Sequence, residues 1–418
     1  MNKNLLEEIL KKLKKKGCDQ ADVIFAEDST SSASSRLGKI EKTEISEIRE
    51  IGIRAIIKNK QSIISSTNLE ADNINKLIDK VVEMAKVVPE DEFCGLAEEK
   101  YFENIKKKNS ELQLFDSYKP KIREINEKVL ELENSALENK KIINSEGAEL
   151  SFSRVKYHLM ASNGFQTEVD KTHSDYIIAV LAGNKNSMER AYDYKSKVFF
   201  HDLGNFKKIG KKVSVNAIKK INSRKIKTCK SDVIFDSKIS SSLLSNLFNA
   251  CNASAIIKGT SFLKKHKEKK VFKSKINIID DPHMKKKLRS KFFDAEGLTT
   301  KKQFLVENGV LKFFFNCLST ARQLKDKPSR HGSRSISSIP SASYSNLFLE
   351  NGDYKKKDMI KSMKKGLLVT ELMGSSINYA NGDYSRGASG FWIENGEISY
   401  PVSEITIAGN LKNIFSNL

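Results

Sequence analysis

The alternation of apolar and polar residues predicts a helix, a group of strands and a second helix at the start of the chain. Apolar residues first repeat at helical spacing: Leu5, Leu6, Ile9, Leu10 and Leu13. Runs of alternating polar and apolar residues then predict short strands: 21–27, 31–40, 41–48, 51–58 and 62–66. A turn at 59–60 joins the last two runs. A helix over about 69–87 is expected to end before Pro89.

The middle of the chain shows the same change between helical and alternating spacing of apolar residues. Helical spacing predicts a helix over about 117–139, and the alternating stretch 141–200 predicts an antiparallel sheet. Turns within that sheet are expected at two dipeptides: Asn163-Gly164 and Gly183-Asn184. Residues 202–221 return to the helical pattern, and a boundary is expected at 223–231.

The second half is expected to begin with a strand at 232–235 and a helix. Asp236 or Ser237 can cap that helix, which runs past Leu243, Leu244 and Leu247. After His266 the pattern predicts mostly strands. Four Asn-Gly dipeptides predict hairpin turns: Asn308-Gly309, Asn351-Gly352, Asn381-Gly382 and Asn395-Gly396.

These elements predict an α+β fold. We expect an N-terminal α/β two-layer region with antiparallel strands and a β-rich C-terminal domain that a helix opens. Three domains are expected: an N-terminal α+β domain at 1–88, a middle helix-plus-sheet region at 113–223 and the β-rich domain at 228–418. A chain of 418 residues is long enough for two or three domains of ordinary size.

Composition narrows the class of protein. No apolar run approaches the roughly 18–20 residues that a membrane span needs, and the first residues are too charged for a signal peptide. We therefore expect a cytoplasmic protein with no membrane association. The five cysteines lie at least 22 residues apart in the sequence, which fits neither a zinc knuckle nor a disulfide framework.

The net charge of +21 raises a nucleic-acid-binding alternative. Of the 73 basic residues, only 12 are arginine, and the lysines are spread over the whole chain. Specific recognition of bases and phosphates favours arginine, and the longest basic cluster, 264–275, contains only one aromatic residue. We expect a solvated basic surface and no specific nucleic-acid binding.

The segment Gly366–Asn410 holds the only tryptophan and seven of the 21 glycines. Its two Asn-Gly turns and the strand-like runs GFWIE and EISYPV resemble the C-terminal signature of PmbA/TldE subunits in the TldD/PmbA metallopeptidase family. Further resemblance is carried by three other segments: Ser34–Glu41, Phe293–Gly297 and Ser345–Leu349.

The resemblance implies a zinc helix whose ligands are missing. Active relatives carry His-Glu-x-x-x-His on that helix and a later cysteine, which would hold Zn²⁺ and leave one position for water. Family spacing back from Lys258 places Leu244, Ser245 and Asn249 at the His, Glu and His positions, and no cysteine follows Cys317. We therefore expect no metal, no cofactor and no catalytic residue in this chain.

The resemblance accordingly implies a non-catalytic subunit. Its partner would be a TldD-like subunit that carries the zinc, and the heterodimer would degrade or process unfolded peptides. Candidate contact residues for the partner or the peptide lie in the C-terminal segment: Tyr384, Arg386, Phe391 and Trp392. Phe391 and Trp392 alternate on one strand, so at most one is expected to face the core. Arg386 has an alternative role, pairing with a nearby carboxylate to fix its loop.

Two further interpretations of the sequence stay open. Asp294 and Glu296 could form a metal or acid/base pair, or they could be a turn-capping Asp and a surface Glu. An independent hydrolase would need a Ser or Cys nucleophile with a paired His, and proximity of that kind is not visible in a sequence.

Overall fold

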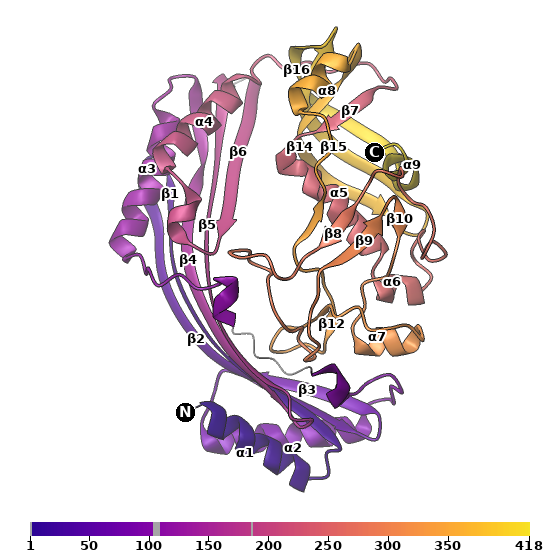
Figure 1. The fold of residues 1–418 in the computed structure, drawn as a ribbon. Helices are drawn as coiled ribbons and strands as arrows, with labels where there is room; N and C mark the ends of the chain where they lie inside the picture. The colour runs from indigo at the N-terminus through magenta and orange to yellow at the C-terminus, as the bar shows by residue number, and fades with distance from the viewer. Residues whose placement is uncertain (1, 103–108, 185–186) are drawn as a thin grey trace.

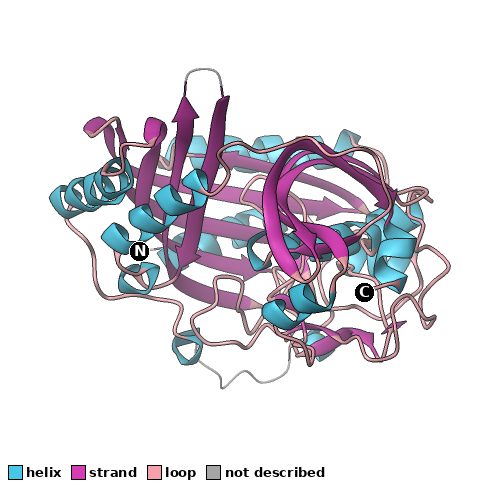
Figure 2. Ribbon diagram, turned by 90° about the horizontal axis from the view of Figure 1, so that it is seen from above, coloured by secondary structure: helices cyan, strands magenta, loops and turns pink. Residues whose placement is uncertain are grey.

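The protein is built from two halves, and a long curved sheet of the N-terminal half wraps around one side of the C-terminal half (Figure 1). The computed structural model describes residues 2–102, 109–184 and 187–418. The two chain termini lie far apart, on different halves, in both views (Figures 1 and 2). Helices and antiparallel sheets are mixed throughout, which confirms the α+β prediction.

The curved sheet has six antiparallel strands in the order β3-β2-β1-β4-β5-β6. Their bounds are β1 Gln20–Arg36, β2 Lys39–Ile57, β3 Lys60–Ser66, β4 Ile142–Ala161, β5 Gln166–Asn184 and β6 Ser187–Lys197. The prediction of four short strands between 21 and 58 was wrong, because they merge into β1 and β2. The polar residues at the predicted breaks remain in the strand because β1 pairs with β2 on one side and β4 on the other.

Four helices cover the convex face of this sheet (Figure 1). Near one end lie α1 (Asn2–Lys15) and α2 (Ala71–Val87), and near the other lie α3 (Ile122–Leu137) and α4 (Phe206–Ile218). Each pair buries its own apolar core against the strands. Side chains alternate between the two faces of a strand, so Val23 and Phe25 pack under α1 and α2 while Ile24 points to the concave face.

Three short 3₁₀ helices lie in the connections: η1 Glu99–Tyr101, η2 Asn109–Leu112 and η3 Phe200–Leu203. The predicted helix at 202–221 is therefore split, since Gly204 has a left-handed φ of 106° that no helix allows. Among the described residues, no helix combines the length and apolar composition needed to cross a bilayer.

The C-terminal half contains a strongly twisted sheet in the order β16-β15-β14-β7. Its strands are β7 Asp232–Phe235, β14 Lys365–Asn378, β15 Asp383–Glu394 and β16 Glu397–Asn410. The helix α5 (Ser237–Ala250) follows β7 and packs against this sheet through Ile239, which shares an apolar cluster with Trp392. Asp236 caps α5, because its side chain accepts a hydrogen bond from the Lys238 backbone N–H.

Shorter elements complete this half. A second sheet has the order β10-β9-β8-β13, and β11 pairs with β12. The strands are β8 Ile278–Asp280, β9 Gln303–Glu307, β10 Val310–Leu311, β11 Gly332–Ser333, β12 Ser341–Ala342 and β13 Leu347–Leu349. The helices are α6 Ala253–Ile257, α7 Leu318–Gln323, α8 Lys356–Ser362 and α9 Leu411–Ser416.

Three of the four predicted Asn-Gly hairpins in this half are present. Asn308-Gly309 and Asn395-Gly396 have left-handed φ at both residues, as the tight turn requires, and Asn381-Gly382 joins β14 to β15. The prediction for Asn351-Gly352 was wrong. That dipeptide leads from β13 into α8, so no second strand follows it.

Two ion clusters join the halves, one buried and one partly exposed. Near the α1–α2 end, the Asp22 carboxylate of β1 pairs with Arg54 of β2 and with Arg334 of the C-terminal half, and all three side chains are at most 5% exposed. At the other end, Glu371 of β14 accepts hydrogen bonds from Arg190 of β6 at 3.0 Å and from Lys220 at 2.7 Å. The two halves are therefore fixed at both ends of their contact.

Between these clusters, backbone lies directly against backbone. A Cβ on Gly52 of β2 would lie 2.1 Å from the carbonyl oxygen of Ile336. Only glycine allows the C-terminal half to approach β2 this closely. A cavity remains farther along the concave face, where the two halves separate.

Candidate functional site

The helix α5 carries the three positions that the sequence resemblance assigned to two zinc ligands and a general base. Leu244 is half-buried against the apolar core of the C-terminal half. The Ser245 hydroxyl donates to the backbone carbonyl of Ser241 at 3.3 Å, one turn earlier. Asn249 is exposed and donates its amide N–H to the Tyr379 hydroxyl at 2.9 Å. These side chains make neutral packing and hydrogen-bond contacts along one helix.

Such side chains do not fit a zinc ion, which takes His, Cys or carboxylate ligands. Among the described residues, no three His, Cys, Asp or Glu side chains are grouped so that they could hold a metal. Cys251, at the end of α5, is fully buried, and burial raises the pKa of its thiol far above the ordinary value. It therefore stays a thiol, which is a poor ligand and a poor nucleophile.

A Ser-His-Asp chain is present in the C-terminal half. One nitrogen of the His331 ring lies 3.0 Å from the Ser329 hydroxyl and the other lies 3.1 Å from the Asp280 carboxylate. However, the three residues are no more than 5% exposed. The Ser329 hydroxyl is already engaged, because it donates to the Asn316 carbonyl and accepts from the Asn316 backbone N–H. A substrate cannot reach this serine, so these three residues form a structural hydrogen-bond network.

The four candidate contact residues on β15 divide into two pairs. Tyr384 and Trp392 are each 2% exposed and belong to apolar cores of this chain. Phe391 is half-buried on the opposite face of β15 from Trp392, as the alternation predicted. Arg386 is also half-buried, and its Nε donates to the Gly374 carbonyl at 2.8 Å. The expected pairing of Arg386 with a carboxylate is therefore wrong, since a backbone carbonyl of β14 takes that place.

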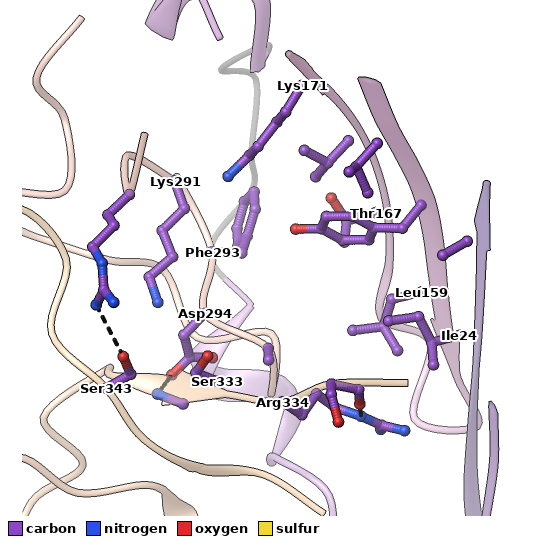
Figure 3. Close-up of a pocket in the computed structure, with 18 of the residues that line it drawn as sticks. Ile24, Leu159, Thr167, Lys171, Lys291, Phe293, Asp294, Ser333, Arg334 and Ser343 are labelled. Carbon is purple, nitrogen blue, oxygen red and sulfur yellow. Dashed lines mark hydrogen bonds between the residues drawn. The ribbon is translucent and has the colours of Figure 1, made fainter. Parts of the chain in front are cut away.

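The structure also reveals a cavity that the sequence did not indicate. It has a volume of about 440 Å³ and lies between the concave face of the long sheet and the C-terminal half (Figure 3). Lys171 of β5 and Lys291 of the C-terminal half extend into the same space, close to Phe293 and Asp294 (Figure 3). With 61 lysines spread along the chain, nothing in their spacing singled out these two.

Asp294, at the base of this cavity, is the turn-capping residue that one interpretation of the sequence expected. Its carboxylate accepts backbone N–H groups from Glu296 at 2.9 Å, Leu298 at 3.0 Å and Gly332 at 3.0 Å. Glu296 differs from the expected surface residue. It is half-buried, and it accepts the Leu318 backbone N–H at 2.9 Å.

Burial and the nearby charge of Asp294 raise the pKa of Glu296 to about 8. Burial and the charge of Glu296 in turn raise the pKa of the Cys317 thiol. Both groups therefore keep their protons near neutral pH. Cys317 is thus no candidate nucleophile, and Asp294 and Glu296 are tied into turn and helix contacts.

Models of known families match nearly the whole chain. The PmbA/TldA metallopeptidase domain 1 matches residues 21–85, the central domain 115–221 and the C-terminal domain 228–418. A metalloprotease PmbA homologue from Buchnera aphidicola is 34% identical over 88% of this chain and 80% of its own length. Metalloprotease PmbA from Escherichia coli is 30% identical over 96% of this chain and 86% of its own.

This chain belongs to the PmbA/TldD metallopeptidase family. The resemblance read from the C-terminal segment is therefore confirmed. The crystal structure of TldE from Thermococcus kodakarensis has the same fold, with a TM-score of 0.87 over 98% of this chain and 92% of that one, at 23% identity. As a PmbA/TldD chain, this protein has its long curved sheet formed by segments from both the first and the central family domains.

Replacing Glu296 with glutamine is expected to change how stability depends on pH. Glu296 holds its proton more tightly when folded, so its stabilising effect is complete below its ordinary pKa of 4.5 and is lost as pH rises through about 8. One unit of pKa corresponds to about 1.4 kcal/mol. On going from pH 5 to pH 8.5, the free energy of unfolding of Glu296→Gln should therefore rise by at least that much relative to that of the parent. Urea unfolding at both pH values measures it. The exposed Glu307→Gln variant is the control, and an unchanged pH dependence in Glu296→Gln would contradict the assignment.

Proposed function

We propose that this chain is a non-catalytic TldE/PmbA-like subunit of a cytoplasmic TldD/TldE zinc metallopeptidase that degrades or processes unfolded peptides. The observation that carries the proposal is the composition of α5. The helix is fully formed and capped, yet Leu244, Ser245 and Asn249 stand at the positions that the resemblance assigns to two zinc ligands and a general base. A water molecule activated by zinc would therefore have to come from the partner subunit.

The rest of the described structure supports a partner role more than an independent activity. The Ser329-His331-Asp280 network is buried, and its serine hydroxyl is already hydrogen-bonded. The thiols of Cys251 and Cys317 are held protonated by burial. No comparable observation favours specific nucleic-acid binding.

The C-terminal sheet offers a surface for such a partner or for an extended peptide. β16 is an outer strand of the sheet, and many of its residues between Glu397 and Asn410 are exposed, although Arg224 bridges its outer edge at Pro401 and Ser403. An outer strand presents backbone N–H and C=O groups that can pair with a further strand almost regardless of sequence. Arg386 and Phe391 lie on the neighbouring β15 and are partly exposed. They remain our candidate contact residues on this sheet, while Tyr384 and Trp392 would act by supporting it from the core.

The proposal is tested by mixing the purified chain with the TldD subunit of the same organism. An unfolded peptide is followed by mass spectrometry, and zinc is measured in each isolated subunit. We expect the mixture to cleave at least tenfold faster than TldD alone, this chain alone to cleave nothing, and zinc to be present in TldD only. Equal cleavage by TldD alone would refute the partner role, as would cleavage by this chain alone.

A substitution in the mixture tests the surface. Arg386→Ala should slow cleavage or weaken association, because arginine is among the residues that most often anchor interfaces. Arg123→Ala is the matched control. Arg123 is exposed on α3, on the convex face of the long sheet, and its only described ion pair is with Glu127 on the same helix. If both variants behave alike, the contact surface does not include Arg386.

A further inference from the structure

The wall of the cavity between the two halves carries two half-buried ammonium groups, Lys171 and Lys291, and neither forms an ion pair with a described residue. The Lys171 ammonium donates to the Ser290 backbone carbonyl at 3.2 Å. For the Lys291 ammonium the described residues provide no hydrogen-bond acceptor and no ion pair. Both lysines line the cavity, and they approach it from opposite walls (Figure 3).

The acidic groups nearest to the lysines are already engaged. Asp294 accepts three backbone N–H groups, as described above. Asp280 interacts with His331 and accepts the Ser345 backbone N–H at 2.7 Å. Neither carboxylate lies within ion-pair distance of Lys171 or Lys291 in the described structure. The cavity therefore keeps a surplus of positive charge.

The two arginines of the wall differ in their partners. Arg289 donates to the Tyr344 carbonyl at 3.0 Å and stacks over the Tyr344 ring. Arg334 pairs with the Asp22 carboxylate, which it shares with Arg54, at the edge of the cavity. Lys171 and Lys291 are thus the half-buried cations of the wall, and the exposed Arg289 adds positive charge beside Lys291.

Holding two ammonium groups in this position is unfavourable for the empty protein, because a charge that is partly removed from water is costly unless it is paired. Burial and the neighbouring charge of Lys291 together lower the pKa of Lys171 to about 8. Burial also lowers the pKa of Lys291, although Asp294 and Asp280 oppose that effect. An anion between the two lysines would remove this cost.

Much of the remaining lining of the same cavity is apolar. Its lining comes mainly from alternate residues of neighbouring strands and from the loop that faces them: Ile24, Leu114, Tyr157, Leu159, Val169 and Phe293. Thr167, Val169 and Lys171 lie opposite Leu159, Tyr157 and Val155 in the β4–β5 register, so one strand face supplies both the apolar wall and a cation. A volume of about 440 Å³ falls within the range of small-molecule sites.

We propose that this cavity binds a small organic carboxylate that carries an apolar group, with the carboxylate between Lys171 and Lys291 and the apolar group against Tyr157, Leu159 and Phe293. Ammonium groups bind carboxylates through short, charge-assisted hydrogen bonds. An inorganic anion would satisfy the lysines but would leave the apolar wall uncovered. The C-terminal residue of a peptide and a free amino acid both have the required chemistry. This site lies in the chain itself and does not depend on a partner subunit.

Isothermal titration calorimetry on the full chain, without any TldD, tests the proposal. N-acetyl-L-leucine should bind, whereas N-acetyl-L-leucinamide, which lacks the charge, should bind at least tenfold more weakly. The tripeptide Gly-Gly-Leu and free leucine distinguish the two sources. Binding of the tripeptide assigns the site to peptide ends, and binding of leucine alone assigns it to amino acids.

The variants connect binding to the two lysines. Lys171→Met and Lys291→Met keep the length of the side chain and remove its charge. Each variant should bind N-acetyl-L-leucine at least tenfold more weakly than the parent. Because a half-buried charge without an ion-pair partner is removed, both variants should melt at or above the temperature of the ligand-free parent, which separates lost binding from lost folding. Lys302→Met, at an exposed position outside the cavity, is the control.

Three results would overturn the proposal: no binding of N-acetyl-L-leucine, equal binding of its amide, or equal binding of inorganic phosphate. Unchanged binding by both lysine variants would overturn it as well. None of these results bears on whether the chain assists TldD, because cleavage by the mixture is measured separately.

Discussion

Asp22→Ala is expected to destabilise the folded chain by about 3–5 kcal/mol, the cost of breaking a buried ion pair from one side. Asp22 is 3% exposed and lies between Arg54 and Arg334. Its removal would leave two guanidinium groups buried without a counter-charge. Since Arg334 belongs to the other half of the molecule, the same change should also loosen the contact between the halves.

Denaturant unfolding of the purified variant measures this effect. Asp79→Ala is the matched control, because Asp79 is 59% exposed and pairs with Lys16 on the surface. Exposed pairs of this kind contribute at most about 1 kcal/mol. If the two variants lose similar stability, the Asp22 cluster does not hold the halves together.

The Asp22 cluster also predicts a loss of stability in acid. Burial alone would raise the pKa of Asp22, but Arg54 and Arg334 outweigh burial and hold the pKa below its ordinary value of 3.8. A lowered pKa stabilises the folded state above the ordinary value, and this contribution is lost as the pH falls through the folded-state pKa. Glu296 acts in the opposite direction, at higher pH.

Trp392→Ala is expected to cost about 3–5 kcal/mol of stability, the usual range for deleting a large aromatic side chain from a core. The ring packs with Ile239 of α5 and Val369 of β14, and its Nε1 donates to Glu394 at 3.2 Å. The change would therefore open a cavity between α5 and the sheet. Phe391→Ala, on the half-buried face of the same strand, should cost clearly less.

Thermal unfolding of both variants, followed by the cleavage assay with TldD, separates folding from association. If Trp392→Ala stays as stable as the parent but fails to support TldD, Trp392 would contact the partner directly. We expect the opposite result, in which Trp392→Ala loses stability and any loss of TldD-dependent cleavage is a consequence of unfolding.

Local sequence patterns were sufficient for most helices and hairpins. The apolar period of α2, the cap of Asp236 on α5 and the turn at Asn395-Gly396 depend on neighbours in the sequence, and they are found where they were expected. The lengths of β1 and β2 were underestimated. Whether polar residues end a strand depends on the strands that pair with it, and β4 is more than 100 residues away from β1 in the sequence.

The residues that form the contact between the two halves could not be predicted from the sequence for the same reason. Asp22 and Arg334 are separated by 312 positions, and the approach of Gly52 to Ile336 spans almost as many. No spacing rule connects such residues. Lys171 and Lys291 are equally distant partners in one cavity, and among so many lysines neither has a distinctive local sequence.

The continuous pairing of β1 with β4 has a consequence for dissecting this protein. Asp22 to Ser35 of β1 pair with Ala148 to Ala161 of β4, so the first and central family domains share one uninterrupted ladder of hydrogen bonds. A fragment that stops near Val88 would leave the β4-facing edge of β1 unpaired. The complementary fragment would leave the matching edge of β4 unpaired. Exposed strand edges of this kind can pair with other chains and cause aggregation. The family domains are therefore units of sequence, and expressing either fragment alone should give aggregates, whereas co-expression of the two should restore a soluble pair.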